Sequence, residues 1–259
     1  MHKEGIAKYV LSLLKSVEKE LLAFQKKKEP EMLHRIRVDI KKMRAILSFL
    51  NYVFKEEHFS EIRTLMPLFH RAGAIRELQI NNKLLNGLPH RPMELIRKLK
   101  EKEKTATRKF YHTIPQHCER VNNLRCKMRL PDEILRRKQI RKYFRKKIKK
   151  ARRELDMSMK NSSDKKREAM HDFRMDIKKM MYVYKVLPGK MRQSIGLETK
   201  YINKLQEKAG EWHDTYAVIN FLHSIRPVSV NYVSELKEKE KNQFKVLLKY
   251  CKKFRIRMK

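Results

Sequence analysis

The most regular feature of the chain is an apolar residue at every third or fourth position, with charged residues between. The first such stripe ends near the KKKEP segment at 26–30 and consists of Leu11, Leu14, Val17, Leu21 and Phe24. This spacing puts the apolar side chains on one face of an α-helix. No alternating pattern of any length indicates a β-strand. The sequence therefore predicts an all-α fold.

The same periodicity predicts four helices in each half of the chain. In the first half we expect helices up to about residue 25, from Pro30 to about Phe54, from about Phe59 to Leu85, and around Leu95, Leu99 and Phe110. In the second half we expect helices at 132–159, 165–187, 198–223 and 229–254. Short connections between helices of this length favour two up-down four-helix bundles packed side by side.

An eleven-residue motif occurs twice. HRIRVDIKKMR at 34–44 and HDFRMDIKKMM at 171–181 are identical at seven positions and lie 137 residues apart. The same offset relates Ala72-Gly73 to Ala209-Gly210. A constant offset over some seventy residues indicates an internal duplication. We expect a first bundle at 1–116, a linker at 117–131 and a second bundle at 132–259, related by an approximate two-fold axis.

Each motif separates apolar from basic residues when it is placed on a helix at about 100° per residue. The predicted core stripes are Ile36, Ile40, Met43 and Leu47 in the first copy, and Phe173, Ile177, Met180 and Tyr184 in the second. We call His34, Arg37, Lys41 and Arg44 the first ridge, and His171, Arg174 and Lys178 the second ridge. Met181 replaces the final Arg of the second copy.

Charged residues also flank the two ridges. Lys42 and Lys179 lie at their edges, and Asp39 and Asp176 lie toward the other side, where we expect pairs with Arg or Lys of a neighbouring helix. A further basic row, at Arg141, Arg145, Lys149 and Arg152, lies on the helix expected at 132–159. We expect this row to form a rim of the binding groove that the two ridges would line.

The formal net charge of +36 makes a polyanion the first expected partner. Arg offers paired donors to phosphate oxygens, Lys offers a mobile point charge, and His becomes a further donor when it is protonated. The six glycines cannot form a Walker or Rossmann phosphate loop. The ridges are therefore the predicted phosphate-binding groups.

A metal site is the main alternative for the motif histidines. Glu31-x-x-His34 and Glu168-x-x-His171 together resemble half of a ferritin-like dimetal site, which also needs two inward carboxylates such as those of Glu20, Glu77, Glu154 or Asp214. Arg37 and Arg174, one turn away, oppose a dication. Glu31 and Glu168 also suit the first turn of a helix, where an acid complements the dipole. We expect no metal and no cofactor.

Catalytic groups are scarce, so we expect a protein that is not an enzyme. His213-Asp214 and His117-Cys118 are sequence neighbours rather than groups arranged across a cleft. Three cysteines without CxxC spacing suit a reducing compartment. Charged residues interrupt every apolar run, which excludes a signal peptide and a membrane span. These features favour a cytoplasmic location.

The doubled motif resembles that of the CHAD family, the conserved histidine α-helical domain. The resemblance rests on LHRIRVDIKKMRAIL at 33–47 and MHDFRMDIKKMMYVY at 170–184, with follow-on segments AGAIREL at 72–78 and AGEWHDT at 209–215. It covers nearly the whole chain. The chain departs from the family pattern at Glu77, where Asp is usual, and at Met181 and His213, where Arg is usual.

The resemblance implies two four-helix bundles whose ridges line a central groove or pore that binds inorganic polyphosphate, with an association with polyphosphate granules. Carried over by motif match, the binding residues are His34, Arg37, Lys41, Lys42, Arg44, Arg76, His171, Arg174, Lys178, Lys179 and His213. Nucleic acid or another anionic polymer is the alternative partner. Aromatic residues are only 8% of the chain, which disfavours a surface for stacking bases.

Overall fold

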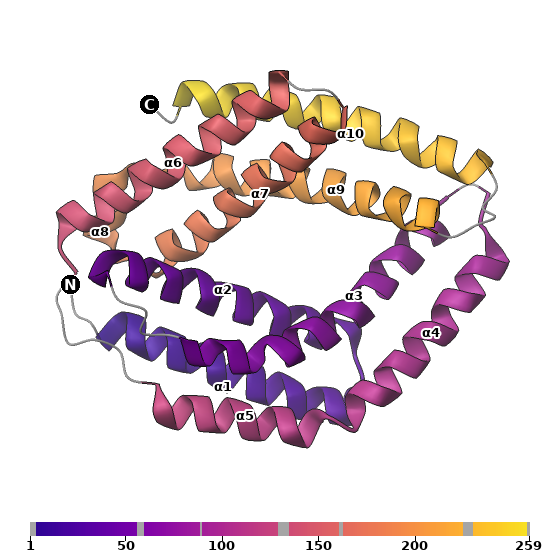
Figure 1. Cartoon of the computed structure of the whole chain (residues 1–259), viewed down its shortest axis with the longest axis horizontal. Coiled ribbons are helices and arrows are strands. Elements are labelled where there is room, and N and C mark those ends of the chain that lie inside the picture. The colour runs from indigo at the N-terminus through magenta and orange to yellow at the C-terminus, as the bar shows by residue number, and fades with distance from the viewer. Residues whose placement is uncertain are drawn as a thin grey trace. The chain divides into compact units, whose positions relative to one another are not determined.

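The computed structural model describes residues 4–55, 60–88, 90–128, 135–160, 163–224 and 230–257. The regular structure in these ranges is helical throughout, which confirms the predicted all-α class (Figure 1). Within them the elements are α1 Glu4–Lys27, α2 Pro30–Phe54, the short 3₁₀ helix η1 Ser60–Leu65, α3 Met66–Asn86, α4 Met93–Tyr111, α5 Ile114–Lys127, α6 Arg137–Lys160, α7 Ser163–Val186, α8 Gly189–Ile195, α9 Thr199–Ser224 and α10 Val230–Arg257.

Helix α2 begins and ends where the sequence predicts. Pro30 stands in its first turn, where the missing N–H removes no helical hydrogen bond. After Phe54, Lys55 adopts a left-handed conformation with φ of 60°, which ends the helix. Helices α7, α9 and α10 also lie close to their expected ranges.

The segment expected to link the two halves, 117–131, differs from the prediction. Its residues up to Lys127 belong to α5, and residues 129–131 lie outside the described ranges. Pro115 occupies the first turn of α5, where proline is tolerated. Val121 and Leu124 bury one face of this helix, which packs on α1.

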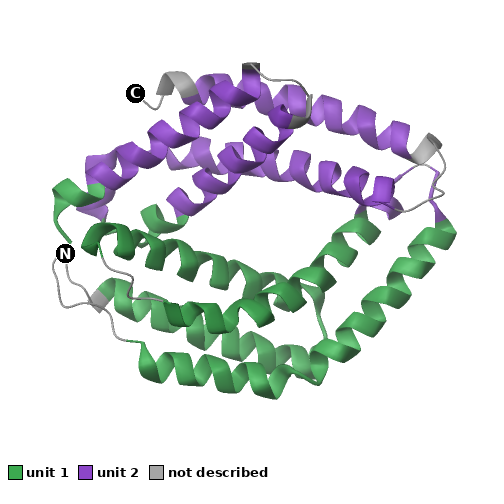
Figure 2. Ribbon diagram, in the orientation of Figure 1, with its two compact units in different colours: residues 1–83, 93–140, 182–188 green, residues 84–92, 141–181, 189–259 purple. Residues whose placement is uncertain are grey.

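The described chain divides into two compact units (Figure 2). Unit 1 comprises residues 1–83, 93–140 and 182–188, and unit 2 comprises residues 84–92, 141–181 and 189–259. The divisions fall inside α3, α6 and α7, so the units do not follow the two halves of the sequence. The organisation as two repeated four-helix bundles stays a prediction.

The core of unit 1 is built around α1, which packs against both α2 and α5 (Figure 1). The buried side chains of α1 include Leu14, Val17, Leu21 and Phe24. The predicted stripe of α2 is buried at all four positions: Ile36, Ile40, Met43 and Leu47. Phe24 also meets the edge of Phe110 from α4, with ring centroids 5.6 Å apart. The apolar periodicity of the sequence thus identified this core correctly.

The core of unit 2 joins α7, α9 and α10. Trp212 of α9 has no exposed surface, and its indole N–H donates to Glu240 Oε1 of α10 at 2.7 Å. Arg167 Nε of α7 donates to the same oxygen at 3.3 Å. Phe173 of α7 packs edge to face on Phe254 of α10, with centroids 5.2 Å apart. One buried carboxylate therefore connects three helices.

Within the described ranges no helix combines the length and the apolar character needed to cross a bilayer.

Replacing Trp212 with Ala should lower the free energy of unfolding by about 3–5 kcal/mol, because it opens a cavity in the core and removes a donor to Glu240. Urea denaturation followed by far-UV circular dichroism measures this loss. Leu22, which is 47% exposed, provides the control: Leu22→Ala should change the free energy of unfolding by no more than about 0.5 kcal/mol. Equal losses in the two variants would contradict this description of the core.

A buried histidine in unit 1 makes stability depend on pH. His117 of α5 is 1% exposed and stacks on Phe110, with centroids 5.9 Å apart. Neither ring nitrogen has a hydrogen-bond partner among the described residues. Burial, together with the nearby charges of Arg120 and Arg71, lowers the pKa of His117 to about 4. The folded protein therefore keeps His117 neutral at a pH where the unfolded chain protonates it.

Stability should consequently fall as the pH drops from about 6.5 toward 4, since only the unfolded state gains this proton in that window. His117→Leu removes the proton-binding group and should flatten this part of the profile. The measurement is the difference in free energy of unfolding between wild type and variant at several pH values. The contributions of all other titrating groups cancel in this difference. Parallel profiles would show that His117 does not titrate in this way.

Candidate functional site

The first ridge lies on α2 on the side away from the buried stripe. His34, Arg37 and Lys41 are half-buried, and Arg44 is exposed. The second ridge lies in the same way on α7, where His171, Arg174 and Lys178 are all half-buried. Apart from Arg44, the ridge side chains are therefore partly covered by the rest of the protein.

Three residues of the first ridge gather around Phe69 of α3. The Arg37 guanidinium carbon lies 4.3 Å from the ring centroid, Lys41 Nζ 5.7 Å and the Arg44 guanidinium carbon 5.8 Å. Arg37 Nη1 also donates to the Phe69 carbonyl oxygen at 2.7 Å. The sequence analysis missed Phe69, whose only signal is its position one turn before the Ala72-Gly73 pair.

Gly73 permits this approach of α2 to α3. A Cβ atom at residue 73 would lie 2.0 Å from Arg37 Nη1, so the guanidinium occupies the space of the missing side chain. Burial lowers the pKa of Arg37; Glu77 opposes this shift and Arg76 adds to it. Arg remains charged nonetheless. Arg76, another predicted binding residue, donates from Nη1 to Gln79 Oε1 at 3.4 Å.

In unit 2 the structure brings together two of the predicted residues. Nδ1 of His171 on α7 lies 3.3 Å from Nδ1 of His213 on α9, and the ring centroids are 4.7 Å apart. A single proton between the two nitrogens makes this a hydrogen bond. Gly210 differs from Gly73, because a Cβ atom there would meet nothing within 4 Å. The two motif copies thus have different surroundings.

The two motif aspartates are buried and paired, one of them as predicted. Asp176 Oδ2 of α7 forms an ion pair with Lys150 Nζ of the neighbouring helix α6 at 2.7 Å. The prediction was wrong for Asp39, whose cationic partner is Lys42 on its own helix, at 2.7 Å. The neighbouring helix α1 instead provides the hydroxyl of Ser16, which donates to Asp39 at 2.7 Å. A short hydroxyl suffices because α1 and α2 pack closely.

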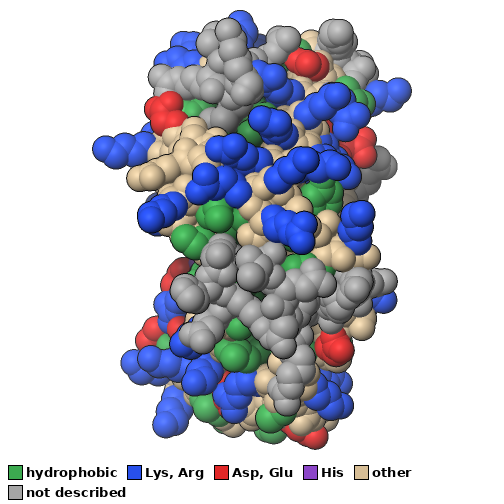
Figure 3. All heavy atoms as spheres, turned by 90° about the vertical axis from the view of Figure 1, so that its left-hand side faces the viewer, with side chains coloured by type: hydrophobic (Ala, Val, Ile, Leu, Met, Phe, Trp, Pro, Cys, Tyr) green, Lys and Arg blue, Asp and Glu red, His purple; other side chains and the backbone are tan. Residues whose placement is uncertain are grey.

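The other predicted basic residues lie at the surface. Lys42 is held by Asp39, whereas Lys179 is exposed. Arg141 and Arg145 of α6 are exposed as well. Figure 3 shows one face of the molecule, on which Lys and Arg side chains gather among few acidic ones.

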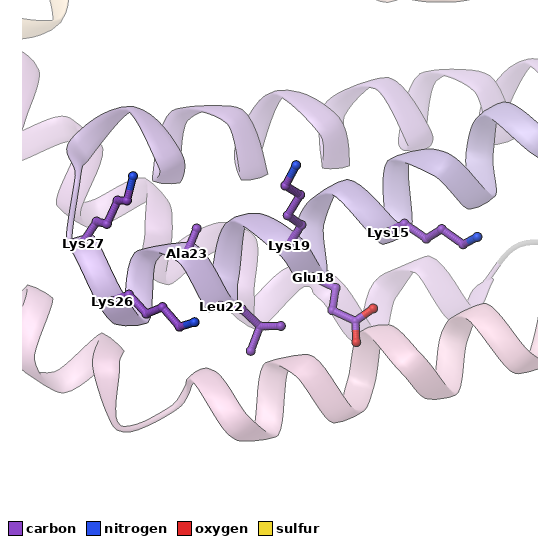
Figure 4. A pocket seen from close by; sticks show the side chains of 7 residues that line it. All are labelled: Lys15, Glu18, Lys19, Leu22, Ala23, Lys26 and Lys27. Atoms are coloured by element: carbon purple, nitrogen blue, oxygen red, sulfur yellow. The ribbon is translucent and has the colours of Figure 1, made fainter.

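A shallow groove of about 420 Å³ runs along α1 (Figure 4). It is lined by Lys15, Glu18, Lys19, Leu22, Ala23, Lys26 and Lys27. Glu18 is held by Arg125 of α5 at 2.8 Å. The sequence analysis used α1 only for its apolar stripe and missed these lysines, although their helical spacing was visible. No residue of either ridge lines this groove.

Possible metal ligands do not cluster: within the described ranges no group of three or more His, Cys, Asp or Glu side chains is arranged to hold an ion. Two of the carboxylates considered for a dimetal site have cationic partners. Glu20 accepts two hydrogen bonds from Arg35, and Glu154 accepts from Lys150 at 3.1 Å.

Comparisons with known proteins agree on one family. A family model described as the CHAD domain matches residues 8–223. The fold is similar to a solved structure described as the crystal structure of the CHAD domain from the plant Ricinus communis, with a TM-score of 0.63 and 15% sequence identity over 98% of this chain and 90% of that chain. No curated protein shows significant similarity to the sequence.

Proposed function

The chain belongs to the CHAD domain family, and from this premise we propose that it binds inorganic polyphosphate through its two ridges without catalysing a reaction. The family is associated with polyphosphate binding in general. The observation that carries the proposal is the gathering of Arg37, Lys41 and Arg44 around one ring. Such a row of cations suits an anion that carries a charge at every repeating unit.

The chemistry of the ridges fits phosphate oxygens. Guanidinium groups offer two parallel donors, and ammonium groups follow a flexible chain as point charges. Like charges so close together repel one another, and a polyanion relieves this repulsion while it releases its own counterions. The proposal places the protein in the cytoplasm, at polyphosphate granules. That both ridges line one groove, with Arg141 and Arg145 at its rim, stays a prediction.

Charge reversal in both ridges should abolish tight binding. Arg37→Glu with Arg174→Glu should weaken polyphosphate affinity by at least about 100-fold, because two charge-assisted contacts are lost and repulsion replaces them. Isothermal titration with long-chain polyphosphate at several salt concentrations measures both affinity and its salt dependence. The wild-type affinity should fall steeply with salt, and the variant should show a smaller slope.

Lys102→Glu with Lys239→Glu is the matched control, because both lysines are exposed and lie in mixed-charge segments. This pair changes the net charge equally and should alter affinity little. Melting curves identify unfolded variants, and Lys41→Glu with Lys178→Glu replaces the first pair if it fails to fold. If the ridge pair and the control pair lose the same affinity, binding comes only from diffuse electrostatic attraction and the ridge proposal is wrong. Equal affinity for single-stranded DNA or RNA at matched charge would favour nucleic acid instead.

Polyphosphate affinity should also rise as the pH falls through the histidine range, around 6.5, because protonated His34, His171 and His213 add cationic donors. The internal phosphates of the polymer stay ionised over this range, so the change reports on the protein. Titrations between mildly alkaline and mildly acidic buffers at fixed ionic strength measure the effect. A triple His→Gln variant should flatten the profile, whereas an unchanged profile would show that the histidines do not contribute.

A further inference from the structure

Phe69 has an unusual environment for a half-buried ring on a helix surface. Three cations, one from each of three successive turns of α2, lie around it: Arg37, Lys41 and Arg44. The face of an aromatic ring is electron-rich and attracts cations within about 6 Å of its centroid. One side chain of α3 therefore gathers most of the first ridge.

Arg37 is fixed by two further features of α3. Its Nη1 donates to the backbone carbonyl of Phe69, which leaves other N–H donors of the five-donor guanidinium for an anion. The guanidinium also occupies the space beside Gly73 that a Cβ atom would fill. The ring, the carbonyl and the glycine together define one position for this charge.

The second motif copy lacks this arrangement. Gln206 stands at the position equivalent to Phe69, and Met181, which is 1% exposed, stands at the position equivalent to Arg44. Gly210 has open space where Gly73 meets a guanidinium. The gathered row of cations is thus a property of the first ridge.

We infer that Phe69 is a positioning residue for anion binding, which holds the first ridge in its binding arrangement and makes this ridge the tighter of the two. The inference rests on the proposed binding of polyphosphate. Long basic side chains lose rotamer freedom when they bind a ligand, and a ridge already held against a ring loses less. Phe69 acts through Arg37, Lys41 and Arg44, without contact to the anion.

Two substitutions at Phe69 separate this role from simple packing. Phe69→Leu keeps an apolar side chain but removes the aromatic face, and should weaken polyphosphate binding by about fivefold to tenfold. Phe69→Tyr keeps the face and should bind within about twofold of wild type. The salt slope should stay unchanged in both, because the number of phosphate contacts is the same. Gln206→Leu, at the equivalent position of unit 2, is the control and should leave affinity unaltered.

Gly73→Ala tests the same inference without touching the ring. Alanine favours a helix more than glycine does, so the melting temperature should not fall, yet its Cβ must displace the Arg37 guanidinium. Affinity should drop severalfold while stability is kept. Gly210→Ala, which meets no neighbour, should change neither property beyond a small gain in stability.

The outcomes distinguish this inference from the proposed function. If Phe69→Leu and Gly73→Ala both bind as wild type while Arg37→Glu with Arg174→Glu does not bind, the positioning role is wrong and polyphosphate binding stands. Equal losses in Phe69→Leu and Phe69→Tyr would likewise overturn the role of the aromatic face. If wild-type protein shows no preference for polyphosphate, the proposed function itself fails, whatever the variants do.

Discussion

Compensation of charge is the constraint on which this fold depends. The chain has 65 Lys and Arg against 29 Asp and Glu, so carboxylates are the scarce partners. Three of the buried ones, Asp39, Asp176 and Glu240, each pair with a side chain of a neighbouring helix through a hydrogen bond or an ion pair. Because an uncompensated buried carboxylate costs about 3–5 kcal/mol, these contacts fix how adjacent helices align. The carboxylates of the chain therefore cannot balance all of its cations.

The two motif copies meet this constraint differently. In the first, Asp39 forms an ion pair with Lys42 of its own helix, and Arg37 donates a hydrogen bond to α3. In the second, Asp176 forms an ion pair with Lys150 of α6, and His171 contacts His213. His213 stands at the position equivalent to Arg76 of the first copy. Arginine keeps its charge at any physiological pH, whereas histidine does not. The first copy therefore carries a constant charge at Arg76, whereas the charge at the equivalent His213 depends on protonation.

The sequence predicted what local geometry determines. The helical period alone placed Ile36, Ile40 and Met43 in the core, and put the ridges on the other side of each helix. The sequence could not predict the contacts between helices, because these depend on the angles at which helices cross and on side-chain rotamers. Phe69 carries no motif of its own. Packing also determines that Asp39 pairs with Lys42 rather than with a cation of a neighbouring helix. Pro115 is compatible with either a linker or a helix start, because proline both starts and ends helices, and the structure places it in the first turn of α5.

The position of Phe69 also bears on which polyanion fits the first ridge. An aromatic residue among cations commonly provides a stacking platform for a nucleic-acid base. Here the guanidinium carbon of Arg37 lies 4.3 Å from the ring centroid, so a cation already occupies one of the faces on which a base could stack. Polyphosphate has no base and needs only donors at suitable spacing. The aromatic ring, which in isolation would favour nucleic acid, therefore favours a bare phosphate chain once its neighbours are taken into account.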